Sequence, residues 1–137
     1  MAETTRIAVA RTLFESWGSS FDDLVAGFKR AMAPNAFSQE PNTPDPSGID
    51  QNVEFLAIAR KAGVMETIDV ELVNMIDDGR FVVSERVDRM KDASGRVMAT
   101  MPCVGIMEFD GDRIAVWRDY FDTADLQSDA ASFIGQK

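Results

Sequence analysis

Arg86, Asp88 and Asp119 are the residues whose types and spacing best suit acid–base chemistry. Arg86 and Asp88 stand two positions apart in a segment with strand-like alternation, so their side chains share one face. Asp119 alternates with Trp117 and Phe121 in a later segment, which places an aspartate between two aromatic rings. A buried aspartate needs a partner, and a planar guanidinium can donate to two carboxylates at once.

Two aspartates held unequally around one arginine suit proton transfer. Burial raises the pKa of a carboxylic acid and a neighbouring guanidinium lowers it, so one aspartate could donate a proton while the other accepts one. The residue pattern alone leaves a simpler interpretation open. In that interpretation Arg86 pairs with Asp88 or Glu85 on a solvated strand face, and Asp119 belongs to a solvated strand end.

Composition narrows the chemistry further. The 137 residues include no histidine, which excludes an imidazole proton shuttle, a Ser-His-Asp triad and His-ligated zinc. The single cysteine, Cys103, excludes an internal disulfide and a multi-cysteine metal site, and no metal site is expected. The formal net charge of −9, from 14 basic and 23 acidic residues, disfavours nucleic acid and anionic membranes as partners.

The elements that must position these residues divide the chain into a helical half and a strand half. Apolar residues recur at helical spacing in three segments, each with a polar cap before it and Gly or Pro after it. We expect helices over residues 5–17, 20–33 and 47–62. A short strand is expected at 36–39, before a Pro-rich loop, and a final short helix is expected from residue 123.

After Gly63, apolar residues recur at every second position instead of at helical spacing. This pattern predicts four strands joined by turns that contain glycine, over residues 68–76, 81–90, 97–109 and 114–121. Helices followed by strands are typical of a segregated α+β fold, in which a curved sheet packs its concave face against the helices. We expect one domain over residues 1–137 with a ligand site in the hollow between the two layers. An open sheet over a solid core, without a pocket, is the alternative.

Two sequence blocks resemble the limonene-1,2-epoxide hydrolase family. Ser84–Asp88 contains an Arg-x-Asp element, and Trp117–Asp122 reads Trp-Arg-Asp-Tyr-Phe-Asp at the family's separation. The order and number of elements also agree over nearly the whole chain. This family belongs to a nuclear-transport-factor-like and SnoaL-like (polyketide-cyclase-like) superfamily, so the resemblance implies a conical, cystatin-like α+β barrel with a curved mixed or antiparallel sheet.

The resemblance also implies roles for the three charged residues. Asp88 would be the general acid that protonates an epoxide oxygen, and Asp119 would be the base that takes a proton from the attacking water. Arg86 would hold both carboxylates and the substrate oxygen. The implied reaction opens a small apolar epoxide to a vicinal diol in one step, without a metal or an organic cofactor.

One part of the chain departs from the family pattern. The family positions its water with a Tyr-x-Asn pair on the short strand before the Pro-rich loop. Alignment on the proline places Phe37 and Gln39 at these positions, whereas alignment on Gly48 places Ser38 and Glu40 there. The amide of Gln39 can hold a water, but Phe37 cannot form a hydrogen bond with one.

The remaining residues expected at the substrate pocket are apolar or polarisable. Methionines can supply an adaptable pocket wall, although ordinary core filling is the alternative for most of them. Cys103 lacks an evident activating base, so we expect it to be a pocket or core thiol and not a nucleophile. The expected pocket residues are Met32, Met90, Met101, Cys103, Trp117 and Phe121.

Three functions are compatible with these residues. The leading hypothesis is a cofactor-independent epoxide hydrolase. The second is a cyclase or isomerase in which one aspartate moves a proton beside a carbonyl, and the third is a non-catalytic small-molecule-binding protein. The N-terminal residues contain no long apolar run, so neither a signal peptide nor a membrane span is expected and the location is cytoplasmic. The resemblance implies a homodimer.

Overall fold

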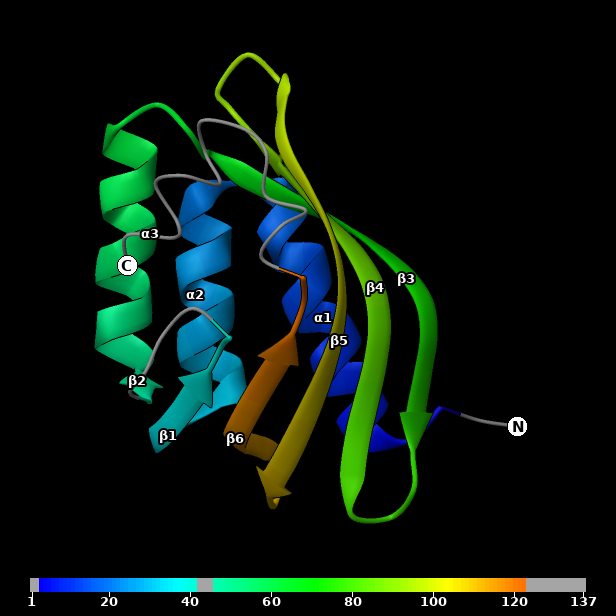
Figure 1. Cartoon of the computed structure of the whole chain (residues 1–137). Helices are drawn as coiled ribbons and strands as arrows, with labels where there is room; N and C mark the ends of the chain where they lie inside the picture. Colours follow the sequence, from blue (N-terminus) through cyan, green and yellow to red (C-terminus); the bar gives the residue numbers. More distant parts are fainter. Residues whose placement is uncertain (1–2, 42–45, 123–137) are drawn as a thin grey trace.

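The computed structural model describes residues 3–41 and 46–122. Three helices and six strands make up this part of the chain (Figure 1). The helices are α1 (Thr5–Ser19), α2 (Phe21–Ala31) and α3 (Ile49–Lys61). The strands are β1 (Met32–Gln39), β2 (Ser47–Gly48), β3 (Thr67–Asp77), β4 (Phe81–Lys91), β5 (Val97–Asp110) and β6 (Arg113–Tyr120).

The helices begin where polar groups satisfy the first backbone N–H groups. The Thr4 hydroxyl caps α1, one residue earlier than expected, and the Ser20 hydroxyl caps α2 as expected. Gly48 is the N-cap of α3, and its N–H donates to the Gln51 side chain. The helix expected from residue 47 thus begins two residues later, because Ser47 and Gly48 form the short strand β2.

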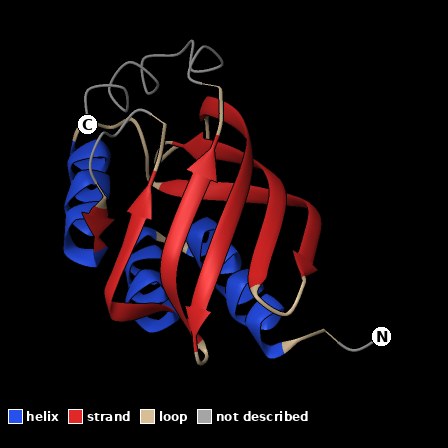
Figure 2. Cartoon of the chain, turned by 60° about the horizontal axis from the view of Figure 1, so that its bottom comes forward, coloured by secondary structure: helices blue, strands red, loops and turns tan. Residues whose placement is uncertain are grey.

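A single curved sheet covers one side of the three helices (Figures 1 and 2). The strand order is β2-β1-β6-β5-β4-β3, and all neighbours pair antiparallel except β1 and β6, which run parallel. Gly79 (φ +95°) and Gly111 (φ +62°) occupy hairpin turns in the left-handed region that favours glycine. The structure thus confirms the expected α+β fold with a curved, mixed sheet around the helices.

The core lies between the helices and the concave face of the sheet. Alternation along β4 sends Val82 and Met90 inward, where they are buried. The helices contribute large apolar side chains, among them Leu13 and Phe14 from α1 and Leu24 from α2. Ring contacts join Phe14, Trp17, Phe28 and Trp117 into one aromatic cluster beneath the sheet.

The largest boundary error concerned β1. The sequence predicted helix up to residue 33 and a strand only at 36–39, but α2 ends at Ala31 and β1 begins at Met32. The Met32 N–H still donates to Phe28 O, so this residue closes the helix and opens the strand. The helix expected from residue 123 lies outside the described residues. None of the helices in the described ranges is long and apolar enough to cross a membrane.

Candidate active site

Arg86 lies at the centre of the candidate site, with a side chain that is fully buried on the concave face of β4. Its guanidinium donates in three directions. Nε lies 2.9 Å from Asp88 Oδ1, Nη2 lies 2.6 Å from Asp119 Oδ2, and Nη1 lies 3.1 Å from Ser84 Oγ. Ser84, Arg86 and Asp88 are buried on one face of β4 because side chains two residues apart point the same way, whereas Glu85 is exposed. One cation thus joins carboxylates from β4 and β6.

Aromatic rings surround the Arg86 guanidinium on its helical side. The guanidinium carbon lies 4.8 Å from the Phe14 ring centre, 5.8 Å from that of Trp117 and 6.0 Å from that of Trp17. Ring faces attract a desolvated cation, which helps to explain an arginine in the core. Burial alone would lower the pKa of Arg86, but the charges of Asp119 and Asp88 outweigh burial and raise this pKa. Arg86 is therefore a permanent cation.

Asp88 is the more deeply buried of the two aspartates, and in the part of the chain that the structure describes its carboxyl group accepts from one donor. Arg86 Nε is shared between Oδ1 at 2.9 Å and Oδ2 at 3.2 Å. Burial raises the pKa of Asp88 above its ordinary value, and the charge and hydrogen bond of Arg86 oppose that rise without cancelling it. The protonated form of Asp88 is therefore favoured relative to an exposed aspartate.

Asp119 has a donor on each carboxylate oxygen. Arg86 Nη2 binds Oδ2, and Trp117 Nε1 lies 2.8 Å from Oδ1. The Asp119 side chain is 15% exposed against 5% for Asp88, so Asp119 loses less hydration than its partner. Gly105 on β5 permits this approach, since a Cβ there would lie 2.5 Å from Asp119 Oδ1 and 2.6 Å from Arg86 Nη1. The two aspartates thus have unequal environments.

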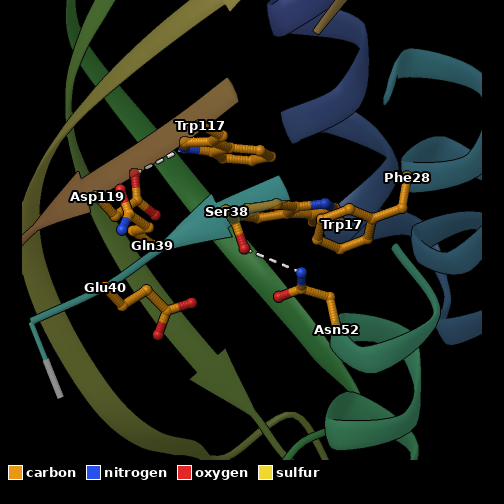
Figure 3. A pocket seen from close by; sticks show the side chains of 8 residues that line it. All are labelled: Trp17, Phe28, Ser38, Gln39, Glu40, Asn52, Trp117 and Asp119. Atoms are coloured by element: carbon orange, nitrogen blue, oxygen red, sulfur yellow. Dashed lines mark hydrogen bonds between the residues drawn. The ribbon is translucent and has the colours of Figure 1, made fainter. Parts of the chain in front are cut away.

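Two cavities open beside these carboxylates. The larger has a volume of about 90 Å³, is mainly apolar, and has both Asp88 and Asp119 on its wall. The smaller has a volume of about 40 Å³ and shares Asp119 with the larger one (Figure 3). The larger cavity is lined by Trp17, Phe28, Glu40, Asn52, Phe55, Leu56, Ile68, Asp88, Met90, Met101, Asp119 and Phe121. The smaller is lined by Trp17, Phe28, Ser38, Gln39, Glu40, Asn52, Trp117 and Asp119.

Polar groups from β1 and α3 form one wall of the smaller cavity. Asn52 is 6% exposed, and its amide nitrogen lies 2.9 Å from Ser38 Oγ and 2.9 Å from Gly48 O. In Figure 3 the amide nitrogen of Asn52 is turned toward Ser38 and its oxygen toward the side of Glu40. Asp119 lines the same cavity. This wall therefore offers both donors and acceptors to a small polar molecule.

Five of the residues expected from the sequence to position water or line the pocket do line a cavity. Met90, Met101 and Phe121 line the larger one, and Gln39 and Trp117 line the smaller one. Met90, Met101 and Phe121 each lie near a candidate catalytic residue, either two positions away along the chain or opposite it on the neighbouring strand. Met101, for example, pairs with Asp88 across β4 and β5.

Three of the expected residues line neither cavity. Met32 is fully buried at the start of β1, where it pairs with Ile114. Phe37 is 36% exposed, because alternation along β1 turns it away from the side on which Ser38 lies. Its proposed place beside the water was therefore wrong. Cys103 is buried in β5 outside both walls, and burial raises the pKa of its thiol.

Helix α3 contributes Asn52 and Phe55, which the sequence interpretation did not single out. The sequence predicted an inward stripe of Val53, Leu56, Ala57 and the stem of Arg60. Leu56 lines the larger cavity together with Phe55, but the buried positions of the helix are Asn52 and Ala59. Positions 52, 55, 56 and 59 follow helical spacing, so this stripe could have been found from the sequence. It was missed because Asn52 is polar and interrupts the apolar pattern of the stripe. Ser38 and Glu40, the pair given by alignment on Gly48, both line the smaller cavity.

This arrangement can perform proton transfer. Two carboxyl groups in unequal environments face one cavity, and a permanent cation links them. Within residues 3–41 and 46–122, no group of three or more Cys, Asp or Glu side chains is placed to hold a metal ion.

Solved structures with the same fold include proteins with different names. An LEH-like epoxide hydrolase of M. tuberculosis is 20% identical, with a TM-score of 0.68 over 88% of this chain and 85% of that chain. A protein provisionally named a SnoaL-like polyketide cyclase, from Jannaschia sp. CCS1, is 19% identical, with a TM-score of 0.72 over 95% and 94%. An NTF2-like protein of unknown function from Burkholderia pseudomallei K96243 is 20% identical, with a TM-score of 0.71 over 90% and 95%. At these identities the likeness shows the fold alone.

Sequence comparison gives the family. No curated protein sequence matches the chain. A family model for the limonene-1,2-epoxide hydrolase catalytic domain matches residues 23–131, which span both blocks with the candidate catalytic residues and more than half of the chain. The chain therefore belongs to the limonene-1,2-epoxide hydrolase catalytic domain family.

Proposed function

We propose that this protein is a cofactor-independent epoxide hydrolase that adds water to a small, largely apolar epoxide and releases a vicinal diol. The observation that carries the proposal is the placement of Arg86 between Asp88 and Asp119 on the wall of an apolar cavity. Membership of the limonene-1,2-epoxide hydrolase catalytic domain family supports it independently.

Asp88 is the general acid in this proposal. Burial raises its pKa, and within residues 3–41 and 46–122 its carboxyl group has one donor, which is shared between the two oxygens. A protonated Asp88 on the cavity wall can donate to an epoxide oxygen as the ring C–O bond breaks. The leaving oxygen then becomes a hydroxyl group without passing through a free alkoxide.

Asp119 is the general base. Each of its oxygens accepts a hydrogen bond, and Asp119 lines both the larger and the smaller cavity. A volume of about 40 Å³ whose walls include several polar side chains is enough for one or a few water molecules. We assign the nucleophilic water to this cavity, next to Ser38 and Asn52. It attacks a ring carbon and gives one proton to Asp119, and exchange with solvent then restores both aspartates.

A covalent route through Cys103 is not part of this proposal. The thiol is buried outside both cavity walls, and burial raises its pKa, so the thiolate nucleophile is disfavoured. The two aspartates and the arginine suffice for a direct addition of water.

A second candidate, a cyclase or isomerase, is favoured by β1. The strand and the residue after it offer Ser38, Gln39 and Glu40 to the cavity, and Phe37 is turned outward, so no tyrosine hydroxyl is supplied from there. A solved structure of similar fold carries a polyketide-cyclase name. In this alternative Asp119 would remove a proton beside a carbonyl and Asp88 would donate to the carbonyl oxygen.

The proposal is tested by incubating the protein with cyclohexene oxide and limonene oxide in ¹⁸O-labelled water. We expect a diol with one labelled oxygen, and about 10²- to 10⁴-fold lower kcat in Asp88→Asn and in Asp119→Asn. Asp110→Asn, at an exposed strand end, is the matched control and should keep full activity. No labelled diol from any epoxide, with saturable binding of the same compounds, would identify a binding protein. Turnover of a carbonyl substrate instead would favour the second candidate.

A further inference from the structure

Trp117 makes a contact that packing alone does not require. Its Nε1–H donates to Asp119 Oδ1 at 2.8 Å, while Arg86 Nη2 occupies the other oxygen of the same carboxylate. Asp88 has no equivalent second donor among the hydrogen bonds of the described residues and shares Arg86 Nε between its two oxygens. The indole N–H is therefore a side-chain donor that distinguishes the two aspartates.

The direction of this N–H is fixed by the rings around it. Trp117 is 3% exposed and stacks on Trp17, with ring centres 5.5 Å apart and an angle of 10° between the planes. Phe14 meets it edge-on at 5.8 Å, and Phe28 lies tilted against it at 6.0 Å. Trp117 and Asp119 are two residues apart on β6, so their side chains share a face and stay adjacent. The donor thus cannot turn away without unpacking the core.

Charged groups around Asp119 oppose one another. Arg86 from β4 is paired with the Asp119 carboxylate, whereas Asp88 from β4 and Glu40 beyond β1 add acidic side chains to the same cavity. Cys103 from β5 is neutral while its thiol stays protonated. The cavity walls from α1, α2 and α3 supply Trp17, Phe28, Phe55, Leu56 and Asn52, none of which carries a charge. Trp117 therefore gives Asp119 a neutral donor in addition to the charged one.

We propose that Trp117 is a positioning residue whose indole N–H holds the Asp119 carboxylate in the orientation in which it also accepts from Arg86, so that Asp119 serves as the base and Asp88 as the acid. This inference rests on the proposed function for its catalytic consequence. The hydrogen bond itself can be tested without any substrate, which separates failure of the inference from failure of the proposed function.

The substrate-free test uses the indole N–H signals in a ¹H–¹⁵N NMR spectrum. The chain has two tryptophans, so Trp17→Phe and Trp117→Phe assign both signals. Trp17 Nε1 is buried without a partner among the described residues and provides an internal reference. We expect the Trp117 proton downfield of the Trp17 proton, and an upfield move of the Trp117 signal in Asp119→Ala but not in Asp110→Ala. If the Trp117 signal keeps its wild-type position in Asp119→Ala, the inference is overturned.

The kinetic test replaces Trp117 with 3-benzothienylalanine by site-specific incorporation, which keeps the fused ring and removes the N–H. We expect kcat about tenfold to a hundredfold lower, with KM little changed, because a hydrogen bond to a charged group is lost. Trp117→Phe should lower kcat in the same way. A wild-type kcat in a folded benzothienylalanine variant overturns the inference, because a purely structural role needs only the fused ring and not its N–H.

Discussion

Burial and ion pairing change the pKa of Asp88 in opposite directions, and the effect of burial is the larger of the two. The pKa of this group is raised, so the folded protein holds its proton more tightly than the unfolded chain does. The stabilisation from the protonated form is complete below the ordinary aspartate pKa of 3.8 and is lost as the pH rises through the raised value. A buried acid that serves catalysis thus costs stability near neutral pH.

Asp88→Asn tests this linkage, because asparagine keeps the shape and cannot ionise. We expect the free energy of unfolding of the wild type, relative to that of Asp88→Asn, to fall as the pH rises from below 4 toward neutrality. Urea unfolding of both proteins over this range measures the difference. Asp110→Asn, at an exposed site, should show no such trend. If the free energy of unfolding of the wild type, relative to that of Asp88→Asn, rises with pH instead, the ion pair with Arg86 outweighs burial and the pKa of Asp88 is lowered.

Gly105 is the residue on which the Arg86–Asp119 contact depends. A Cβ there would press on Asp119 Oδ1 and Arg86 Nη1, both of which are fixed by other hydrogen bonds. We expect Gly105→Ala to destabilise the protein by about 1–3 kcal/mol and to reduce kcat by more than this loss of folded protein explains. Val104→Ala, on the outer face of the same strand, is the control for a general effect on β5. Full activity in Gly105→Ala would show that the contact is not needed for catalysis.

At the scale of elements, the contact between α1 and α2 is one of the closest in the helical layer. A Cβ on Gly27 would overlap Ser16 Oγ and lie 3.0 Å from the Ser16 Cβ. These two helices carry the rings that hold Trp117, since α1 supplies Phe14 and Trp17 and α2 supplies Phe28. Their spacing therefore affects the site as well as stability.

Gly27→Ala should lower the free energy of unfolding by about 1–3 kcal/mol, although alanine is the better helix former. The overlap with Ser16 outweighs the higher helix propensity of alanine, so the substitution is destabilising. The exchange Ser16→Gly with Gly27→Ala moves the side chain to the other helix and should recover most of the loss. Thermal unfolding of the single and double variants measures both effects. A double variant no more stable than Gly27→Ala would place the cause elsewhere.

Strand alternation predicted the inward face of β4 correctly, because a period of two fixes the direction of every side chain once one is known. The same rule could not settle β1. That strand begins directly after α2, and its pairing with β6 shifts register between Met32 and Phe37, so a sequence alignment off by one residue reverses inside and outside. Phe37 was misplaced for this reason, and Ser38 is the residue on the cavity side.

At the scale of the whole molecule, the site depends on the parallel pairing of β1 with β6. This pairing joins segments far apart in the sequence and sets Ser38 opposite Trp117 and Gln39 opposite Arg118. No local pattern in the chain specifies such a pairing. The order of helices and strands predicted a hollow between the two layers, but it could not predict which residues of β1 face Asp119. The homodimer expected from that resemblance stays a prediction, testable by sedimentation.

The net charge of the molecule predicts a preference among substrates. The chain carries −9, and the described cavity walls present Glu40, Asp88 and Asp119, while the Arg86 side chain is fully buried. An epoxide with a carboxylate should therefore have a kcat/KM at least about tenfold below that of its methyl ester at low ionic strength.

Added salt separates the two sources of this effect. The part of the kcat/KM difference that comes from long-range repulsion by the net charge should shrink as ionic strength rises from about 0.01 to 0.5 M. The part that comes from repulsion inside the cavity should persist, because solvent ions screen it less. A matched epoxide with an amine group should show the opposite dependence on salt. Equal kcat/KM values for the acid and the ester at every salt concentration would contradict the prediction and imply that the carboxylates of the cavity are neutralised when substrate binds.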